Sequence, residues 1–153
     1  MSSKPVHFIS GTALGICAAL ACFKAYGPVQ AAAVLFGAIA GSSAPDWFEI
    51  SRWKKGKKRW LKPDDQDVRQ SLIGHRTLTH WFLLWAFLSP YCAYLVFKNP
   101  ADIAHVFFFG FAISGLLHVL MDAQTTMGIP VLHPWKRTPG RKKYPNKINR
   151  QKM

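Results

Sequence analysis

The sequence predicts an all-α protein, a four-helix transmembrane bundle, on two observations. Half of the 153 residues are hydrophobic, and most of them gather into four apolar runs. These runs approach the length of about 20 apolar residues that a helix needs to cross a bilayer. We therefore expect one membrane-embedded domain over residues 1–134 and a basic tail over residues 135–153 that is extended or disordered.

The chain is strongly basic, with 20 Lys and Arg against 7 Asp and Glu and a formal net charge of +13. Such a balance favours an anionic partner, either nucleic acid or a lipid surface. A soluble nucleic-acid module would not need the apolar runs, so they favour membrane lipids and argue against nucleic acid as the main ligand. Three cysteines, an odd number, lie inside apolar stretches and are expected to be small core hydrophobes: Cys17, Cys22 and Cys92.

The first helix is predicted over residues 8–26 and ends at a turn formed by Gly27 and Pro28. Ala, Gly and small polar residues are frequent in this run, which suits close helix packing in a membrane. A signal peptide is the competing interpretation, but Lys24 and Tyr26 fit a cleavage region poorly and more apolar runs follow.

The second run, residues 29–44, is slightly short for a bilayer. The residue before a proline avoids helical geometry, so Pro45 is expected to stop this helix near Ala44. Asp46 would then lie at a helix end.

A polar connection follows over residues 47–70, and its first half is basic. One interpretation is a solvated loop that obeys the positive-inside rule, by which cytoplasmic loops are rich in Lys and Arg. A sharper interpretation, compatible with the first, is a surface that holds anionic headgroups. Three tryptophans would then lie at the membrane interface: Trp47, Trp53 and Trp60.

The third and fourth helices are predicted over residues 80–97 and 103–121, with a turn at residues 98–100 between them. Pro90 is expected to bend the third helix, because proline removes a helical hydrogen bond. Basic residues lie before the first run, between the second and third, and after the fourth. Four spans with both termini in the cytoplasm place all of them on one side of the membrane.

Histidines and aspartates recur at one end of this predicted bundle and form a candidate metal site. Imidazole and carboxylate groups together suit Zn²⁺ best, with Mn²⁺ or Fe²⁺ as alternatives, and their number allows one or two ions. An up-down-up-down bundle puts them at the cytoplasmic end, whereas His105 lies near the opposite end. The candidate ligands are His7, Asp46, His75, His80, His118 and Asp122.

Two spacings in this set constrain the geometry. His118 and Asp122 are four residues apart, so they lie within about 40° of each other on a helix and can reach one cation. His75 and His80 are five residues apart, about 140° around a helix, so we expect His75 to lie in the turn before the helix. Each residue taken alone also has a simpler role, as a hydrogen-bonded histidine or a capping carboxylate.

These elements resemble the YdjM-like family of bacterial inner-membrane proteins, described as metal-dependent hydrolases that are LexA-regulated or LexA-binding. The resemblance covers residues 7–134, and a His-Arg-x-x-Thr-His block is its most specific element. The matching residues are His7 with Gly11 and Gly15, Pro45 with Asp46, His75, Arg76, Thr79 and His80, His118 with Asp122, then Gly128 and Pro130 or Pro134.

The resemblance implies a multi-pass protein of the bacterial inner membrane that carries out metal-assisted hydrolysis. The six candidate ligands would hold the metal, and His133 is considered only as an additional ligand. Arg76 would clamp an anionic oxygen of the substrate, and Asp46 is the alternative candidate for a general base. A LexA-type regulator is an implied protein partner.

Charge and predicted location favour an anionic phosphoester as the substrate, such as a phospholipid headgroup at the cytoplasmic face. The alternative is a non-enzymatic membrane anchor or regulator that recruits a protein, anionic lipid or DNA through the basic connection and tail. Metal content separates the two, because an anchor would keep its function without His80 or His118 whereas a hydrolase would lose metal and activity together.

Overall fold

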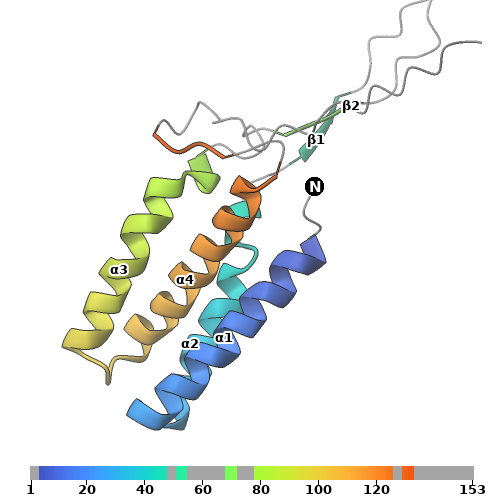
Figure 1. The fold of residues 1–153 in the computed structure, drawn as a ribbon. Coiled ribbons are helices and arrows are strands. Elements are labelled where there is room, and N and C mark those ends of the chain that lie inside the picture. The colour runs from blue at the N-terminus through green and yellow to red at the C-terminus, as the bar shows by residue number, and fades with distance from the viewer. Residues whose placement is uncertain (1–3, 48–50, 55–67, 72–77, 126–128, 133–153) are drawn as a thin grey trace, which may run out of the picture.

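The structure is a computed structural model that describes residues 4–47, 51–54, 68–71, 78–125 and 129–132. The predicted four helices are confirmed, and they run alternately up and down (Figure 1). Their bounds are Lys4–Tyr26 for α1, Pro28–Gly41 for α2, Phe82–Lys98 for α3 and Ile103–Ala123 for α4.

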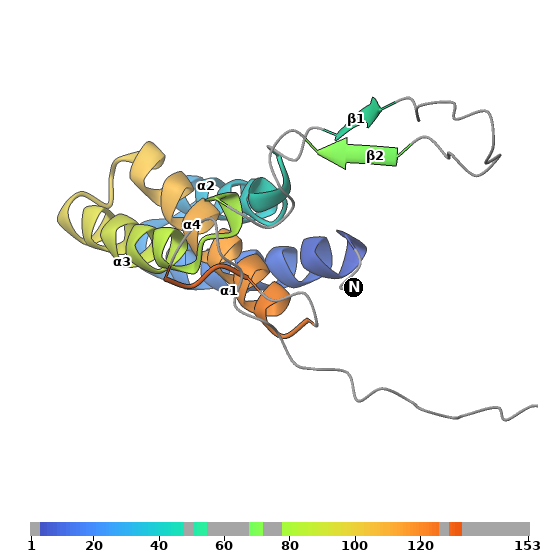
Figure 2. The ribbon, with the colours of Figure 1, turned by 90° about the horizontal axis from the view of Figure 1, so that it is seen from above.

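Helices α2 and α4 form the central pair, with α1 packed mainly on α2 and α3 packed on α4 (Figures 1 and 2). Glycine allows the central pair to approach closely. A Cβ at Gly37 would overlap the carbonyl oxygen of Phe107, and a Cβ at Gly110 would overlap that of Val34. Small residues at a helix contact are the usual means of close packing in membrane proteins.

The turn between α1 and α2 depends on Gly27, whose φ of +99° lies in the left-handed region. Glycine adopts such a φ without steric cost. Pro28 then begins α2, where its missing N–H costs nothing and its fixed φ suits a helix. The turn predicted at these two residues is therefore confirmed.

Helix α2 ends at Gly41, three residues before the end predicted at Ala44. The hydroxyl of Ser42 donates to the carbonyl oxygen of Ile39 at 2.7 Å, so a side chain satisfies a carbonyl of the last helical turn. Pro45 does not stop α2 itself. It lies inside a short 3₁₀ turn, η1 (Ala44–Asp46), which carries Asp46 past the helix end.

Two of the four helices are long and apolar enough to cross a membrane, over Pro5–Tyr26 and Ile103–Ala123. Helices α2 and α3 are apolar but have 14 and 17 residues, or about 21 and 26 Å at 1.5 Å per residue. The structure thus contains two candidate spans, and the four-span topology with cytoplasmic termini stays a prediction.

A short antiparallel ribbon interrupts the connection predicted as polar. Its strands are β1 (Ser51–Lys54) and β2 (Val68–Ser71), with Ser51 opposite Ser71. The ribbon lies beyond the end of the bundle where α1 begins (Figure 2). The all-α prediction therefore describes the bundle, and the ribbon is an addition that the sequence did not indicate.

Candidate metal centre

Ionisable side chains meet at the end of the bundle where α1 begins and α4 ends. A second 3₁₀ turn, η2 (Leu78–His80), precedes α3 and brings its histidine to this end. Of the predicted ligands, His75 lies outside the described residues, as do Arg76 and His133. The structure brings the other predicted ligands together: His7 from α1, Asp46 from η1, His80 from η2, and His118 and Asp122 from α4.

Two imidazoles and two carboxylates form the centre of this cluster. His80 Nε2 lies 3.4 Å from Asp46 Oδ1 and 3.4 Å from Asp122 Oδ2. His118 Nε2 lies 3.8 Å from each of the same two oxygens. Both imidazoles therefore present Nε2 to carboxylates that come from η1 and α4.

His7 adds a third imidazole on the other side of Asp122. Its Nε2 lies 3.4 Å from Asp122 Oδ1, so the two carboxylate oxygens of Asp122 approach different histidines. The ring of His7 stacks on that of His118, with centroids 3.9 Å apart and planes 16° apart. His118 thereby belongs to two groups that could each hold an ion, one with His7 and Asp122 and one with Asp46 and His80.

The spacing of the donor atoms fits a tetrahedral metal. Charge-assisted N–H···O bonds are about 2.7–2.9 Å long, which is shorter than the five imidazole–carboxylate distances given above. Zinc bonds of about 2.0–2.1 Å place the ligand atoms of a tetrahedron about 3.3–3.4 Å apart. Three of the distances are 3.4 Å, and the two at 3.8 Å would contract by about 0.4 Å on binding. These buried groups can hold a metal ion.

Burial distinguishes Asp46 from the rest of the cluster. His7, His80, His118 and Asp122 are all buried, whereas 21% of the Asp46 side chain is exposed. Ionisable groups are costly to bury unless they are paired or coordinated. The cluster therefore has a closed interior and one carboxylate that reaches the surface.

The orientation of His118 by Ser42 was not predicted from the sequence. His118 Nδ1 donates to the carbonyl oxygen of Ser42 at 2.7 Å, because a carbonyl can only accept. This bond fixes the proton on Nδ1 and leaves the lone pair of Nε2 directed at the carboxylates. Metal-binding histidines are commonly oriented in this way through their second nitrogen. The small-residue stretch after Gly41 was the only available signal.

Trp85 in α3 supports the turn that carries His80 and was also missed by the sequence analysis. Its indole N–H donates to the carbonyl oxygen of Thr79 at 2.8 Å. The ring of Trp85 lies against Gly115 in α4, where a Cβ would overlap it. Together these contacts fix η2 relative to α4, and with it the position of His80 beside Asp122.

In the metal-free protein, the pKa shifts of Asp46 and His80 favour opposite charges on the two side chains. Burial opposes the charge of Asp46, but the hydrogen bond with His80 and the charges of His118 and His80 hold its pKa below the usual range. Burial likewise opposes the charge of His80, but hydrogen bonds and charge from Asp122 and Asp46 raise its pKa. Asp46 and His80 thus form an ion pair, and a cation bound between them would have to replace the proton on His80.

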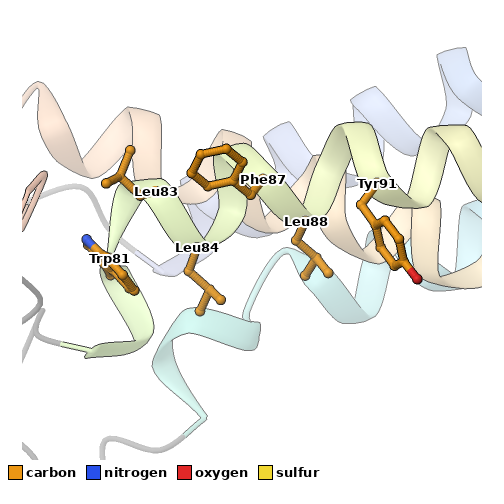
Figure 3. Close-up of a pocket in the computed structure, with 6 residues that line it drawn as sticks. All are labelled: Trp81, Leu83, Leu84, Phe87, Leu88 and Tyr91. Carbon is orange, nitrogen blue, oxygen red and sulfur yellow. The ribbon is translucent and has the colours of Figure 1, made fainter.

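A cavity of about 540 Å³ lies away from the histidine–aspartate cluster, along the exposed side of α3 (Figure 3). Its lining side chains come from the N-cap and the first ten residues of this helix and are almost entirely apolar: Trp81, Leu83, Leu84, Phe87, Leu88 and Tyr91. None of them belongs to the histidine–aspartate cluster. This almost entirely apolar groove suits contact with lipid tails.

Comparison with known proteins agrees with a membrane protein. The chain is 29% identical over 134 residues to a protein of Bacillus subtilis (strain 168) described as uncharacterized protein YfhP. That alignment covers 86% of this chain but 37% of the relative, so the chain spans little more than a third of its length. No solved structure matches the chain. The family described as YdjM inner membrane protein matches residues 1–150, so the chain belongs to the YdjM inner membrane protein family.

Proposed function

We propose that this protein is a membrane-bound, metal-dependent hydrolase that acts on a phosphoester at the cytoplasmic face of the membrane. The observation that supports the proposal most strongly is the cluster itself, in which groups from η1, η2, α1 and α4 meet at distances of 3.4 to 3.8 Å. Residues so far apart in sequence would have little reason to share a buried polar centre in a simple anchor.

The ligands would be His7, Asp46, His80, His118 and Asp122, with Zn²⁺ as the first candidate ion and Mn²⁺ or Fe²⁺ as alternatives. A bound divalent metal lowers the pKa of its water to about 7 and polarises a phosphoryl oxygen. Two overlapping groups of ligands allow one ion or two. His75 would complete the set if it joins the centre.

The reaction would add the hydroxyl of water to phosphorus and the remaining proton to the leaving alcohol, so it needs no other co-reactant. Asp46 is the exposed carboxylate of the cluster, which makes it the candidate general base. Arg76, next to the predicted ligand His75, would bind an anionic oxygen of the substrate through its guanidinium fork.

The position of the cluster supports a reaction at the membrane surface. Both candidate spans place their cluster-bearing ends together, since α1 begins with His7 in its first turn and α4 ends with Asp122. A net charge of +13 favours anionic substrates and, by the positive-inside rule, a cytoplasmic location for the basic segments. In this proposal α2 and α3 also span the membrane and both termini are cytoplasmic.

Metal analysis of the detergent-purified protein tests the proposal. We expect one or two equivalents of metal in the unmodified protein, with loss of both metal and phosphodiester hydrolysis in His80→Ala and His118→Ala. His105→Ala is the matched control, because His105 also lies near an aspartate, Asp102 at 3.6 Å, but at the opposite end of α4. A folded protein that purifies without metal and cannot be reconstituted with Zn²⁺, Mn²⁺ or Fe²⁺ would contradict the proposal.

The alternative function, a membrane anchor or regulator, is favoured by the net charge of +13. Such a protein would recruit anionic lipid, DNA or a LexA-type regulator through its basic segments. It would keep this recruitment in His80→Ala and His118→Ala and lose it when the tail from Lys136 is removed. The same variants therefore separate the two functions.

A further inference from the structure

A small pocket opens directly onto the metal centre between α1 and the end of α2. Its volume is about 190 Å³. Its lining includes the cluster residues His7, Asp46 and His118 and two aromatic residues, Phe8 and Trp47. The pocket therefore joins the ionisable cluster to an aromatic surface.

The volume of this pocket limits what can enter it. Pockets that enclose a whole drug-sized ligand are about 300–1,000 Å³, so 190 Å³ is too small for a nucleotide or a complete lipid. A phosphate group with its two ester linkages is small enough to fit. The remainder of any larger substrate must lie outside, against the residues at the pocket mouth.

The mouth of the pocket is aromatic and exposed. Phe8 is 52% exposed and Trp47 is 54% exposed, although both line the pocket. Trp47 is fixed in place, since its indole N–H donates to the hydroxyl of Ser43 at 3.0 Å and its ring lies 5.7 Å from that of Phe111. A substrate part that covers these rings gains most if it is apolar.

The position of the pocket mouth along the bundle also favours a substrate with an apolar part. Phe8 belongs to the first turns of a candidate span, so the mouth lies at the membrane end of the bundle. Exposed tryptophans at that level are typical of the membrane–water interface. An amphiphile that stays in the bilayer could place its headgroup linkage in the pocket while its chain stays in contact with lipid.

We propose that the pocket selects amphiphilic phosphodiesters, with the diester at the metal centre and the first part of the apolar chain against Phe8 and Trp47. This inference rests on the proposed function, because the diester is the group that the centre would hydrolyse. Phe8 and Trp47 act as specificity-determining residues, and the substrate belongs to the lipid class and not to soluble nucleotides or sugar phosphates.

A pair of substrates with the same scissile bond tests this selection: dodecyl p-nitrophenyl phosphate and methyl p-nitrophenyl phosphate. The zinc-reconstituted full chain should cleave the dodecyl diester with a kcat/KM about tenfold higher, the effect of covering about half of one aromatic ring. Phe8→Ser and Trp47→Ser should each reduce this ratio by about threefold, mainly through KM, and Trp47→Phe should restore most of it.

Phe23→Ser is the matched control, because Phe23 is 57% exposed on the same helix but far from the cluster. It should leave kcat/KM unchanged for both substrates. Equal kcat/KM values for the two diesters in the unmodified protein would overturn the inference, as would a reduced ratio in Phe23→Ser equal to that in Phe8→Ser. Either result leaves the proposed hydrolase intact if both diesters are cleaved.

Cleavage of neither diester would instead overturn the proposed function, and the inference is then decided by binding. In the Co²⁺-substituted protein, dodecylphosphonate should change the visible metal spectrum at a concentration about tenfold lower than methylphosphonate. Equal concentrations for the two phosphonates, or no spectral change with either, would overturn the inference.

Discussion

His118 Nδ1 and the carbonyl oxygen of Ser42 form a 2.7 Å hydrogen bond between two helix ends that are 76 residues apart in sequence. Ser42 follows the last residue of α2, and His118 lies in the last two turns of α4. The bond therefore couples the packing of the two central helices to the direction of an imidazole lone pair. Metal affinity should depend on helix packing as well as on the ligands themselves.

Gly41→Ala tests this coupling. A Cβ at Gly41 would overlap the backbone of Phe111 in α4, so α2 and α4 must separate next to Ser42. We expect thermal unfolding in detergent to show a loss of about 1–3 kcal/mol in the free energy of unfolding. Zinc affinity should fall about tenfold or more, as in other proteins that lose the partner of a metal-binding histidine.

Gly37→Ala is the control for the same helix pair. A Cβ there would overlap the carbonyl oxygen of Phe107, about one helical turn farther from the candidate metal centre than Gly41. It should reduce stability by a similar amount and zinc affinity by much less. Equal losses of affinity in the two variants would show that packing in general, and not the Ser42 contact, determines metal binding.

Trp85→Phe is expected to weaken metal binding by releasing the turn that carries His80. The variant keeps a ring against Gly115 but removes the N–H that donates to Thr79 at 2.8 Å. Loss of one such bond should cost about 1 kcal/mol of stability and about tenfold in zinc affinity. Competition with a chromogenic chelator measures the affinity.

Ser89→Ala provides the comparison for this variant. The hydroxyl of Ser89 in α3 donates to the carbonyl oxygen of Ala112 in α4 at 3.1 Å, so the substitution removes a buried bond about one helical turn beyond Trp85. It should cost a similar amount of stability and leave zinc affinity nearly unchanged. If Ser89→Ala lowered zinc affinity as much as Trp85→Phe, the special role of Trp85 would be wrong.

The meeting of His7, His80, His118 and Asp122 could be predicted from sequence because each lies at a helix boundary. Alternation of direction from one helix to the next then sends all these boundaries to one end. The four-residue spacing of His118 and Asp122 added a local test that does not depend on the tertiary structure. Periodicity and topology were sufficient for this part of the site.

The residues that orient the ligands could not be predicted in the same way. The partner of His118 is a backbone carbonyl, which every residue possesses, so the identity of residue 42 does not reveal the contact. The support from Trp85 depends on its contact with Gly115, which is set by the register of α3 against α4. The end of α2 was misplaced because a serine hydroxyl satisfied the helix carbonyl before Pro45 was reached.

Zinc affinity is expected to rise with pH through the neutral range. Burial opposes the charge of His80, but the Asp122 and Asp46 carboxylates raise its pKa, so the metal-free protein keeps this proton to a higher pH than free imidazole would. The metal must displace it, which costs about tenfold in affinity for each pH unit below that pKa. Asp46, whose pKa is lowered, stays ionised and adds no such dependence.

Dissociation constants measured at several pH values between 6 and 8 would check this expectation. Isothermal titration in buffers of different ionisation enthalpy would count the protons released on binding. An affinity that is independent of pH, with no proton release, would show that His80 is already neutral or does not bind the metal.

Asp122→Asn should separate the effect of the metal on stability from the effect of packing. The asparagine keeps the size of the side chain but removes the charge that faces His7 through Oδ1 and His80 and His118 through Oδ2. Zinc present at about 1,000 times its dissociation constant should stabilise the unmodified protein by about 4 kcal/mol. In a chain of this size that corresponds to a rise in Tm of about 10 °C. The variant should show almost no rise on addition of zinc, and EDTA should lower the Tm of the unmodified protein to its metal-free value while leaving that of the variant unchanged.

His105→Ala should keep the full response, because His105 contacts only Asp102 among the ion pairs of the described residues. An equal zinc-induced rise in Asp122→Asn and in the unmodified protein would place the ion outside the cluster, and the assignment of α4 as a ligand-bearing helix would then be wrong.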